Sequence, residues 1–446
     1  MRQVAGPAVL LVSLALSAHS ASGVPDVTYF YPSGGQRGET VAVAVGGSLP
    51  QWPVSFWTSD DKVRVTALEE KGKASVEIAA DADAGPVWIR VYDQQGAALP
   101  KPWIVGVGPE VNETEPNDQP TQAQLLVCSE APLQTLTAHG QLQQAGDADV
   151  MAVDVAAGQT LVADLDANET IASPFDGVLQ VLRPDGFVAA QNDDSHGLDS
   201  QLAVHVSQSG RWFVRVFGFP ATPTEQIRLG GDPAYVYRLT ISTGPVVHYA
   251  LPMAARRNHS NQFEVDGWNL TDELRTFSVQ PTSRQSAMPL GEDLFGRTLR
   301  IPLLDHSVLV ETEPNNQSEP INVTLPVSMT GRIGEPGDRD AFQFDGVKDE
   351  TVEIELHSRD LGYPLDGVLE LFDAKDQRVT RVDDEGALRD PRLVHQVKED
   401  GPLRLVVSDL HGSGRHSFVY RLAIARGQPS FRLTTESHQA MVKAGE

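Results

Sequence analysis

The feature that most constrains the fold of this chain is an internal repeat, in which short motifs return in the same order later in the sequence. Residues 113–118 (ETEPND) return as 311–316 (ETEPNN), an offset of 198. Residues 237–239 (YRL) return as 420–422, an offset of 183, and matches between them have intermediate offsets. A slow drift over ordered matches is expected of one domain that occurs twice, with insertions and deletions in its loops.

A second, fainter repeat fills the segments between these copies. Three residue pairs align at a constant offset of 220: Pro32 with Pro252, Arg37 with Arg257, and Gly47 with Gly267. We therefore predict short and long units in alternation. The predicted boundaries are a signal peptide at 1–23, a short unit at 24–109, a long unit at 110–245, a short unit at 246–310, a long unit at 311–428, and the start of a further, truncated module at 429–446.

The local pattern of residues is almost entirely that of β-strands. Apolar and small or polar residues alternate over 40–45, 351–356 and 419–424. Asp, Asn, Gly and Pro mark turns at short intervals, and no window longer than about ten residues keeps a helical period without Gly or Pro. The sequence predicts an all-β fold of tandem β-sandwich domains.

The N-terminus has the composition of a secretory signal peptide. Arg2 precedes an apolar run at 9–16 that is too short to span a bilayer, and small residues follow at 17–23. No later window is apolar over the roughly 18 residues that a membrane-spanning helix needs. We predict an exported protein, secreted, periplasmic or at the cell surface, without a transmembrane segment in the mature chain.

The charge balance and the cysteine content exclude other classes of function. With 35 basic and 60 acidic residues the net charge is −25, which argues against nucleic acid as a partner because phosphate binding needs a surplus of Lys and Arg. The single cysteine, Cys128, excludes an intramolecular disulfide framework and a Cys-based zinc ribbon. We expect Cys128 to be a small buried residue.

The repeated acidic motif has the donor atoms of a cation site. In an extended segment alternate side chains share one face, so Glu113, Glu115 and Asn117 would project together. Asp147 and Asp149 follow about 30 residues later in an Asp-x-Asp loop. Calcium prefers roughly six to eight oxygen ligands in a flexible geometry. The alternative is a solvated acidic linker that only marks the edge of a domain.

Five motifs occur in the same order in residues 110–244 and 311–427: ETEPND/ETEPNN, GDADVM/GDRDAF, DGVL, NDD/VDD and a closing Y-x-L-x-I. With these motifs both segments resemble the bacterial pre-peptidase C-terminal domain. Members of this family are β-sandwich accessory domains of secreted proteases and other exported proteins. Some are related to the collagen-binding domains of clostridial collagenases, in which an acidic linker and Asp-bearing loops chelate calcium. The short units resemble Ig-like modules of the IPT/TIG type.

Carried over by position, this resemblance implies one calcium site in each long unit. The implied ligands in the first copy are Glu113, Glu115, Asn117, Asp118, Asp147 and Asp149. Those in the second copy are Glu311, Glu313, Asn315, Asn316, Asp338 and Asp340. Because Asn316 replaces the acid at 118, the second site carries less charge and should bind calcium more weakly. No aromatic collagen-binding patch is recognisable, which disfavours collagen as the ligand.

The sequence contains none of the short motifs that identify common hydrolases or nucleotide-binding enzymes. HExxH, GxSxG, the P-loop and CxxCH are all absent. We therefore predict a non-enzymatic protein, a calcium-stabilised spacer or binding array that recruits an extracellular or cell-surface macromolecule. The alternative is the accessory, non-catalytic portion of a larger secreted peptidase whose catalytic domain lies outside this chain.

Overall fold

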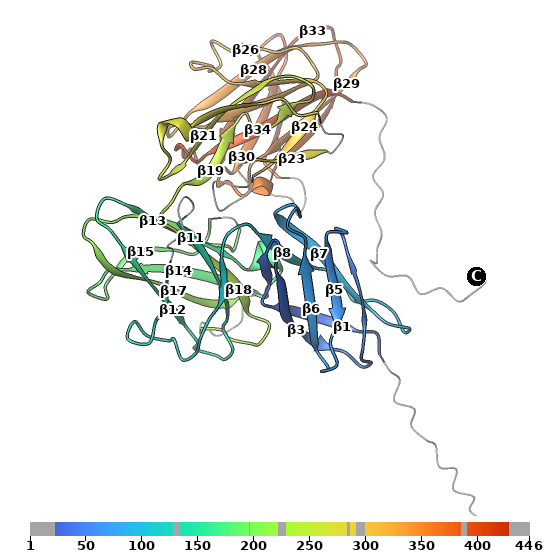
Figure 1. Cartoon of the computed structure of the whole chain (residues 1–446). Coiled ribbons are helices and arrows are strands. Elements are labelled where there is room, and N and C mark those ends of the chain that lie inside the picture. Colours follow the sequence, from blue (N-terminus) through green and yellow to red (C-terminus); the bar gives the residue numbers. More distant parts are fainter. Residues whose placement is uncertain are drawn as a thin grey trace, which may run out of the picture.

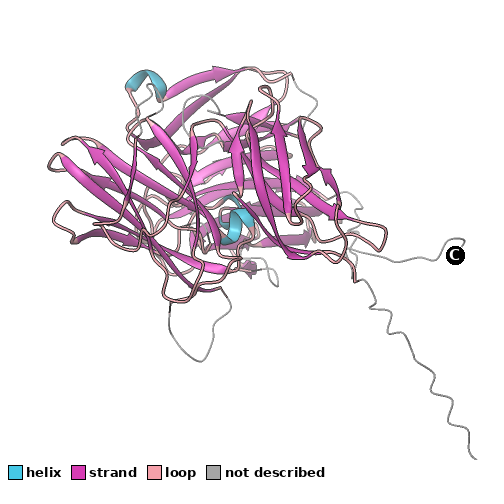
Figure 2. Cartoon of the chain, turned by 60° about the horizontal axis from the view of Figure 1, so that its bottom comes forward, coloured by secondary structure: helices cyan, strands magenta, loops and turns pink. Residues whose placement is uncertain are grey.

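The computed structural model describes residues 23–127, 134–195, 197–221, 229–282, 286–290, 299–384 and 390–427. The predicted signal peptide, apart from its last residue, lies outside the described residues, as do Cys128 and the predicted module at 429–446. The described part is built almost entirely of strands, with one short α-helix and two 3-10 turns (Figures 1 and 2). The predicted all-β class, with tandem β-sandwiches, is confirmed. No helix among the described residues has the length and apolar character needed to cross a membrane.

The first short unit is a sandwich of two four-stranded sheets, with strand orders β1-β3-β6-β5 and β2-β8-β7-β4. Its core lies between the sheets around Trp103, which is fully buried and donates its indole N–H to Pro32 O (3.0 Å). The strands are β1 (Asp26–Tyr31), β2 (Gly34–Gln36), β3 (Thr40–Ser48), β4 (Ser55–Thr58), β5 (Val63–Ala67), β6 (Lys73–Ile78), β7 (Gly85–Tyr92) and β8 (Lys101–Gly106).

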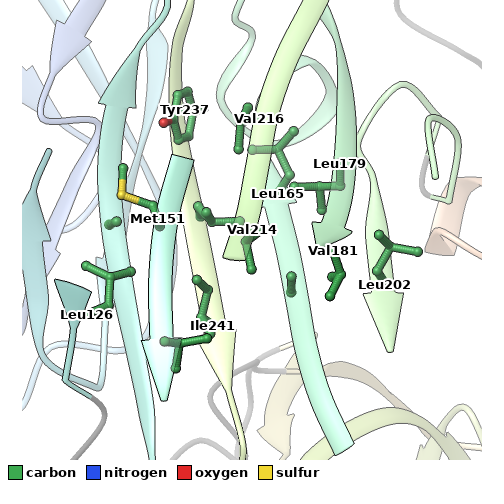
Figure 3. Close-up of a cluster of buried hydrophobic side chains, with 14 of the residues drawn as sticks. Leu126, Met151, Leu165, Leu179, Val181, Leu202, Val214, Val216, Tyr237 and Ile241 are labelled. Atoms are coloured by element: carbon green, nitrogen blue, oxygen red, sulfur yellow. The ribbon is translucent and has the colours of Figure 1, made fainter. Parts of the chain in front are cut away.

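The first long unit is a sandwich of two five-stranded sheets, with strand orders β10-β12-β17-β14-β15 and β16-β13-β18-β11-β9. Figure 3 shows its core, in which side chains such as Leu165, Val214 and Ile241 from the two sheets meet. The elements are β9 (Glu110–Asn112), β10 (Gln124–Leu126), β11 (Thr135–Gln141), β12 (Asp149–Val155), β13 (Thr160–Asp166), α1 (Asn168–Ile171), β14 (Phe175–Leu182), β15 (Val188–Asn192), β16 (Gln201–His205), β17 (Gly210–Pro220) and β18 (Val236–Ser242).

The second short unit is smaller, with two three-stranded sheets of order β19-β21-β22 and β20-β24-β23. Its first strand pair has the same irregularity as that of the first short unit, between Val247 and Tyr249 in one and between Val27 and Tyr29 in the other. The elements are β19 (Val246–Leu251), β20 (Ala255–Arg256), β21 (Asn261–Trp268), η1 (Asp272–Leu274), β22 (Thr276–Val279), β23 (Ala287–Leu290) and β24 (Leu299–Leu304).

The second long unit has the strand order of the first, β26-β28-β33-β30-β31 in one sheet and β32-β29-β34-β27-β25 in the other. Its first strand begins at Ser307, four residues before the boundary that the motif at 311 suggests. The elements are β25 (Ser307–Val310), β26 (Ile321–Asn322), β27 (Val327–Arg332), β28 (Arg339–Gly346), β29 (Thr351–His357), η2 (Arg359–Leu361), β30 (Gly367–Phe372), β31 (Arg378–Val382), β32 (Arg392–Gln396), β33 (Gly401–Asp409) and β34 (Val419–Arg426).

The second short unit contacts the long units on both of its sides. Asn269 donates to Thr160 O (2.8 Å) and Gly244 O (3.0 Å), and it accepts from Thr160 N (3.2 Å), which fastens it to the first long unit. On its other side Met253 N donates to Thr330 Oγ1 (2.8 Å) in the second long unit. In Figure 1 this unit, with β19 and β21, accordingly lies against the second long unit.

Candidate metal centres

The acidic segment that follows β9 is fastened to one end of the first long unit. Gln141 N, at the end of β11, donates to Glu113 Oε1 (2.7 Å). Val150 N, in β12, donates to Asn117 O (3.0 Å), and Asn117 N donates to Glu115 Oε2 (2.9 Å). These bonds place the linker glutamates over the point where β12 begins.

Three carboxylates converge at this point. Glu113, Glu115 and Asp149 each place an oxygen atom within 4.8 Å of the others. The hydroxyl group of Tyr237 donates to Asp149 Oδ2 (2.6 Å) and also reaches Glu113 Oε2 (3.4 Å). Asp149 is buried and Glu115 is exposed, so the cluster extends from the interior of the sandwich to the surface.

Two buried oxygen atoms of the first cluster have no hydrogen-bond partner in the described part of the chain. They are Asn117 Oδ1 and Asp149 Oδ1, on side chains that are fully buried. The other end of the Asn117 amide is occupied, because Nδ2 donates to Glu113 Oε2 (3.5 Å). An unpaired buried polar atom costs about 1–3 kcal/mol and calls for an explanation. Neutral and charged oxygens beside one another are the donor set that calcium prefers, so the residues present fit this ion.

The second long unit repeats this arrangement. Glu311, Glu313 and Asp340 again place oxygens within 4.8 Å of one another, and Tyr420 donates to Asp340 Oδ2 (2.5 Å). Asn315 Nδ2 donates to Glu311 Oε2 (3.0 Å). The Oδ1 atoms of Asn315 and Asp340 are buried and have no hydrogen-bond partner among the described residues. The same unsatisfied atoms therefore occur at the same positions in both copies.

The buried carboxyl groups of both clusters have raised pKa values. Burial raises the pKa of Asp149 to about 10 and that of Asp340 to about 9, and the neighbouring glutamate adds to the rise. Burial likewise raises the pKa of Glu113 and of Glu311 to about 7. Two adjacent carboxylates in a buried site cannot both be ionised without a compensating positive charge. Each cluster must therefore hold a proton or a cation at neutral pH.

The first aspartate of each Asp-x-Asp loop is not among the three converging carboxylates. Asp147 Oδ2 accepts from Gln143 N (2.6 Å), and Asp338 Oδ2 accepts from Gly334 N (2.8 Å). Each of them caps the turn that precedes β12 or β28. The charge of Asp147 contributes to the raised pKa of Asp149, so Asp147 affects the ionisation of the cluster without being one of its three converging carboxylates.

The residues at positions 118 and 316 also lie outside the three converging carboxylates. Asp118 is exposed, and its charge contributes to the raised pKa values of Glu115 and Asp147. Asn316 Oδ1 accepts from Ser318 N (3.0 Å) and from Ser318 Oγ (2.6 Å), so it caps a turn. This position adds negative charge near the first cluster and none near the second.

Sequence reasoning missed the two tyrosines that donate to the buried aspartates. Each reaches its cluster because a glycine stands opposite it: a Cβ atom at Gly140 would lie 2.0 Å from Tyr237 Cζ, and one at Gly331 would lie 2.3 Å from the Tyr420 hydroxyl. The repeat of Tyr-Arg-Leu at 237 and 420 is visible in the sequence. The pairing of β18 with β11, which brings the tyrosine to the glutamate, is a long-range contact and cannot be seen in the sequence.

The first cluster lies beside the junction between the first short and first long units. The hydroxyl of Tyr31, in the short unit, donates to His139 O (3.3 Å) in the long unit. Burial raises the pKa of Tyr31, and the charges of Glu113 and Asp149 add to this rise. A change of charge in the cluster therefore changes the electrostatic environment of a side chain in the neighbouring unit.

A buried ion pair lies at the same junction, beside a hydrogen bond with His139, whose pKa is lowered by burial. Glu110 contacts Arg238 Nη2 through Oε1 (2.5 Å) and His139 Nε2 through Oε2 (2.7 Å), and all three side chains are at most 6% exposed. A Cβ atom at Gly34 of the short unit would lie 2.6 Å from Arg238 Nε, so the short unit packs directly against this guanidinium. Removing either member of such a pair leaves an uncompensated buried charge.

The junction between the second short and second long units has an apolar centre, and the Tyr363 hydroxyl donates to His248 O (3.3 Å) beside it. Tyr249 and Met253 of the short unit pack with Tyr363 and Val419 of the long unit. The rings of Tyr249 and Tyr363 are 6.4 Å apart in an edge-to-face arrangement. At the position of Tyr31 this unit has Leu251, which has no hydroxyl group to reach the long unit.

Comparison with known proteins identifies one family. The model of the bacterial pre-peptidase C-terminal domain matches residues 147–218, from the turn before β12 to β17. The first long unit is therefore similar to this domain over residues 147–218. For the second long unit, and for the Ig-like character of the short units, the resemblance stays a prediction. A search of the curated proteins found no match.

Solved structures that match the chain include the following three, each with low sequence identity. The pre-peptidase C-terminal domain of a collagenase from Bacillus anthracis is 15% identical, over 26% of this chain and 99% of that one, with a TM-score of 0.19. Tripeptidyl peptidase 2 is 12% identical over 88% of this chain and 32% of that one, with a TM-score of 0.19. The CUB1-EGF-CUB2 region of human MASP-1/3 is 10% identical over 64% and 99%, with a TM-score of 0.16.

Proposed function

We propose that this chain is a non-catalytic modular protein of the cell exterior, in which calcium at two sites stabilises a spacer or binding array. The observation that supports the calcium sites is the repeat of the same unpaired oxygens in two long units, at Asn117 and Asp149 and at Asn315 and Asp340. The unpaired oxygens thus belong to the repeated motif, and a cation would satisfy all of them.

At the first site Glu113, Glu115, Asn117 and Asp149 would hold the ion. Bound calcium supplies the positive charge that lets both buried carboxyl groups ionise. Glu113 and Glu115 belong to the linker and Asp149 to the body of the sandwich, so a shared cation fastens the linker to the domain. Without the cation, Asp149 holds a proton instead, and no ion joins the linker to the sandwich.

The second site would be held by Glu311, Glu313, Asn315 and Asp340 in the same way. Extracellular calcium modules bind with dissociation constants of about 10⁻⁴–10⁻³ M. The first site should be the tighter of the two, because Asp118 adds a negative charge that Asn316 does not.

The test is a calorimetric calcium titration of the chain from residue 24 to 446. We expect two binding sites, one site in each of the variants Asp149→Asn and Asp340→Asn, and none in the double variant. The matched control is Asp154→Asn, because Asp154 also lies on β12 but is exposed and paired with Arg211 (3.0 Å). Calcium binding that is absent in the wild type, or that persists in the double variant, would falsify the proposal.

A second candidate function is that of an accessory region of a larger secreted peptidase. The match of residues 147–218 to the pre-peptidase family favours it. The coding sequence around this chain tests the idea: a peptidase domain in the same reading frame supports it, and further short and long units alone exclude it. In either case we expect the purified chain to release no product from a peptide library.

A further inference from the structure

Three large aromatic side chains are exposed on one face of the first short unit. Trp57, Trp88 and Tyr92 are 51%, 46% and 42% exposed. Trp57 lies on β4 directly opposite Arg90 of β7, and Trp88 and Tyr92 lie two residues to either side of Arg90. Because side chains alternate along a strand and the intervening residues of β7 are in the core, these four residues share the outward face. We call them the aromatic platform.

The platform is held by the regular sheet beneath it. Trp88 and Tyr92 are four residues apart on one strand, so their Cα atoms are about 13 Å apart, and Trp57 lies on a strand roughly 5 Å away. Trp88 N donates to Ser59 Oγ (3.0 Å), just beyond the end of β4, which ties the two strands together. The rings thus form a fixed surface that is wider than one small ligand.

The shape of the platform favours an extended ligand. Exposed apolar patches on a protein surface mark sites of interaction. The platform is an open sheet face, because its rings lie on one side of two adjacent strands; a cavity of about 300 Å³ lies elsewhere, in the second long unit between residues 373–379 and 395–403. A compact ligand would therefore be left largely in water, whereas an extended one can lie across all three rings.

The charge of the chain favours a neutral ligand. The net charge of −25 repels polyanions and acidic membrane surfaces. A cationic ligand would meet Arg90 at the centre of the platform. An extended neutral chain that has both apolar faces and hydroxyl groups suits the rings and the guanidinium donors together.

We propose that the aromatic platform binds a neutral polysaccharide, with sugar rings stacked on Trp57, Trp88 and Tyr92 and with Arg90 donating to sugar hydroxyls. The C–H groups on the face of a sugar ring are weakly positive and complement the negative face of an aromatic ring. Trp and Tyr have few rotatable bonds, so they lose little entropy when a ligand covers them. This proposal does not depend on the calcium sites.

The test is native affinity electrophoresis of the whole chain in gels that contain dissolved hydroxyethyl cellulose, arabinoxylan, β-1,3-glucan, glucomannan or starch. We expect retardation in at least one gel, in EDTA as in calcium. Trp57→Ala and Trp88→Ala should each weaken binding about three- to tenfold, and the double variant should abolish retardation. Trp57→Phe should retain it. The control is Phe187→Ala, which removes an aromatic ring that is 66% exposed in the first long unit.

Three outcomes would overturn the proposal. One is the absence of retardation by all five polysaccharides. Another is a double variant that migrates like the wild type while melting at the same temperature. The third is retardation by anionic carboxymethyl cellulose as strong as that by its neutral counterpart, or retardation that disappears in EDTA. Calcium titration is a separate measurement. A negative result in the polysaccharide gels therefore does not affect the proposal of calcium sites, and a negative calcium titration does not affect the proposal of polysaccharide binding.

Discussion

Replacing Asp149 with asparagine tests whether the buried cluster is a site for a positive charge. Asp149 is fully buried, and its pKa lies at about 10 instead of 3.8. At pH 8 without calcium, the folded state therefore holds a proton that the unfolded chain has released. Keeping this carboxyl protonated at pH 8, which is 4.2 units above its ordinary pKa of 3.8, lowers the free energy of unfolding by at most about 6 kcal/mol, at about 1.4 kcal/mol per unit.

Asparagine removes this cost and keeps the shape of the side chain. Its Oδ1 can still accept from Tyr237, and its Nδ2 can donate to Glu113. Because Asp149 is neutral in the folded state at pH 8, the gain is limited to the cost of keeping its proton, at most about 6 kcal/mol, less whatever the amide loses in fit. In EDTA at pH 8, we expect Asp149→Asn to be about 2 kcal/mol more stable than the wild type, although the substitution lies in the interior of the protein.

Calcium should reverse this order. At 100 times the dissociation constant a ligand stabilises the folded state by about 2.7 kcal/mol. The wild type should gain this amount and the variant none, so that the wild type becomes the more stable protein. Scanning calorimetry of the first long unit within the whole chain measures both effects, with Asp154→Asn as the control. The reasoning is refuted if Asp149→Asn is less stable than the wild type in EDTA, or if calcium stabilises both proteins equally.

Three further predictions follow from the same contacts. The pKa values of the buried carboxyl groups are raised in the folded state, so the folded state binds more protons than the unfolded one. Without calcium, the free energy of unfolding should therefore be highest near pH 4 and fall as the pH rises toward 10. Urea unfolding midpoints that rise over this range would contradict this prediction. Gly140→Ala should push Tyr237 out of the first cluster, cost about 1–3 kcal/mol and abolish calcium binding at that site alone, as calorimetry would show. Arg238→Met should destabilise the first long unit by about 3–5 kcal/mol, because buried Glu110 keeps only its hydrogen bond with His139 and Asp166 also loses its guanidinium partner. In urea titrations, Arg238→Met with Glu110→Gln should recover part of this loss.

Local patterns in the sequence predict the strands and the duplication, because both depend on residues close together in the chain. Alternation over 351–356 corresponds to β29, whose residues are alternately half-buried and buried. The linker residues Glu113 and Asn117 also meet, since Asn117 Nδ2 donates to Glu113, but the predicted extended segment is wrong, because the chain bends at Glu115. Sequence spacing is a sufficient guide only where the strand is regular, as in β29.

The same reasoning fails where a turn interrupts the strand or where the partner is distant in sequence. Asp147 and Asp149 are two residues apart, which would place them on one face of a strand, but β12 begins only at Asp149. Asp147 lies in the preceding turn and caps it. Tyr237 lies 88 residues beyond Asp149, and only the pairing of β18 with β11 brings the two together.

The chemical difference between the two junctions implies different roles for the two calcium sites. At the first junction Tyr31 of the short unit lies in the field of Glu113 and Asp149, so replacing a proton by calcium changes the electrostatic environment of both units. At the second junction Leu251 occupies the position of Tyr31, and the contact is made by apolar side chains and by hydrogen bonds that do not involve Glu311 or Asp340, such as that from the Tyr363 hydroxyl to His248 O (3.3 Å). Calcium at the first site should therefore influence the angle between the units, whereas at the second site it should stabilise only its own long unit.

The aromatic platform lies on β4 and β7 of the first short unit, whose β8 packs through Ile104 against the first junction. Of the two sites, the first is thus the one that would orient the platform relative to the rest of the chain.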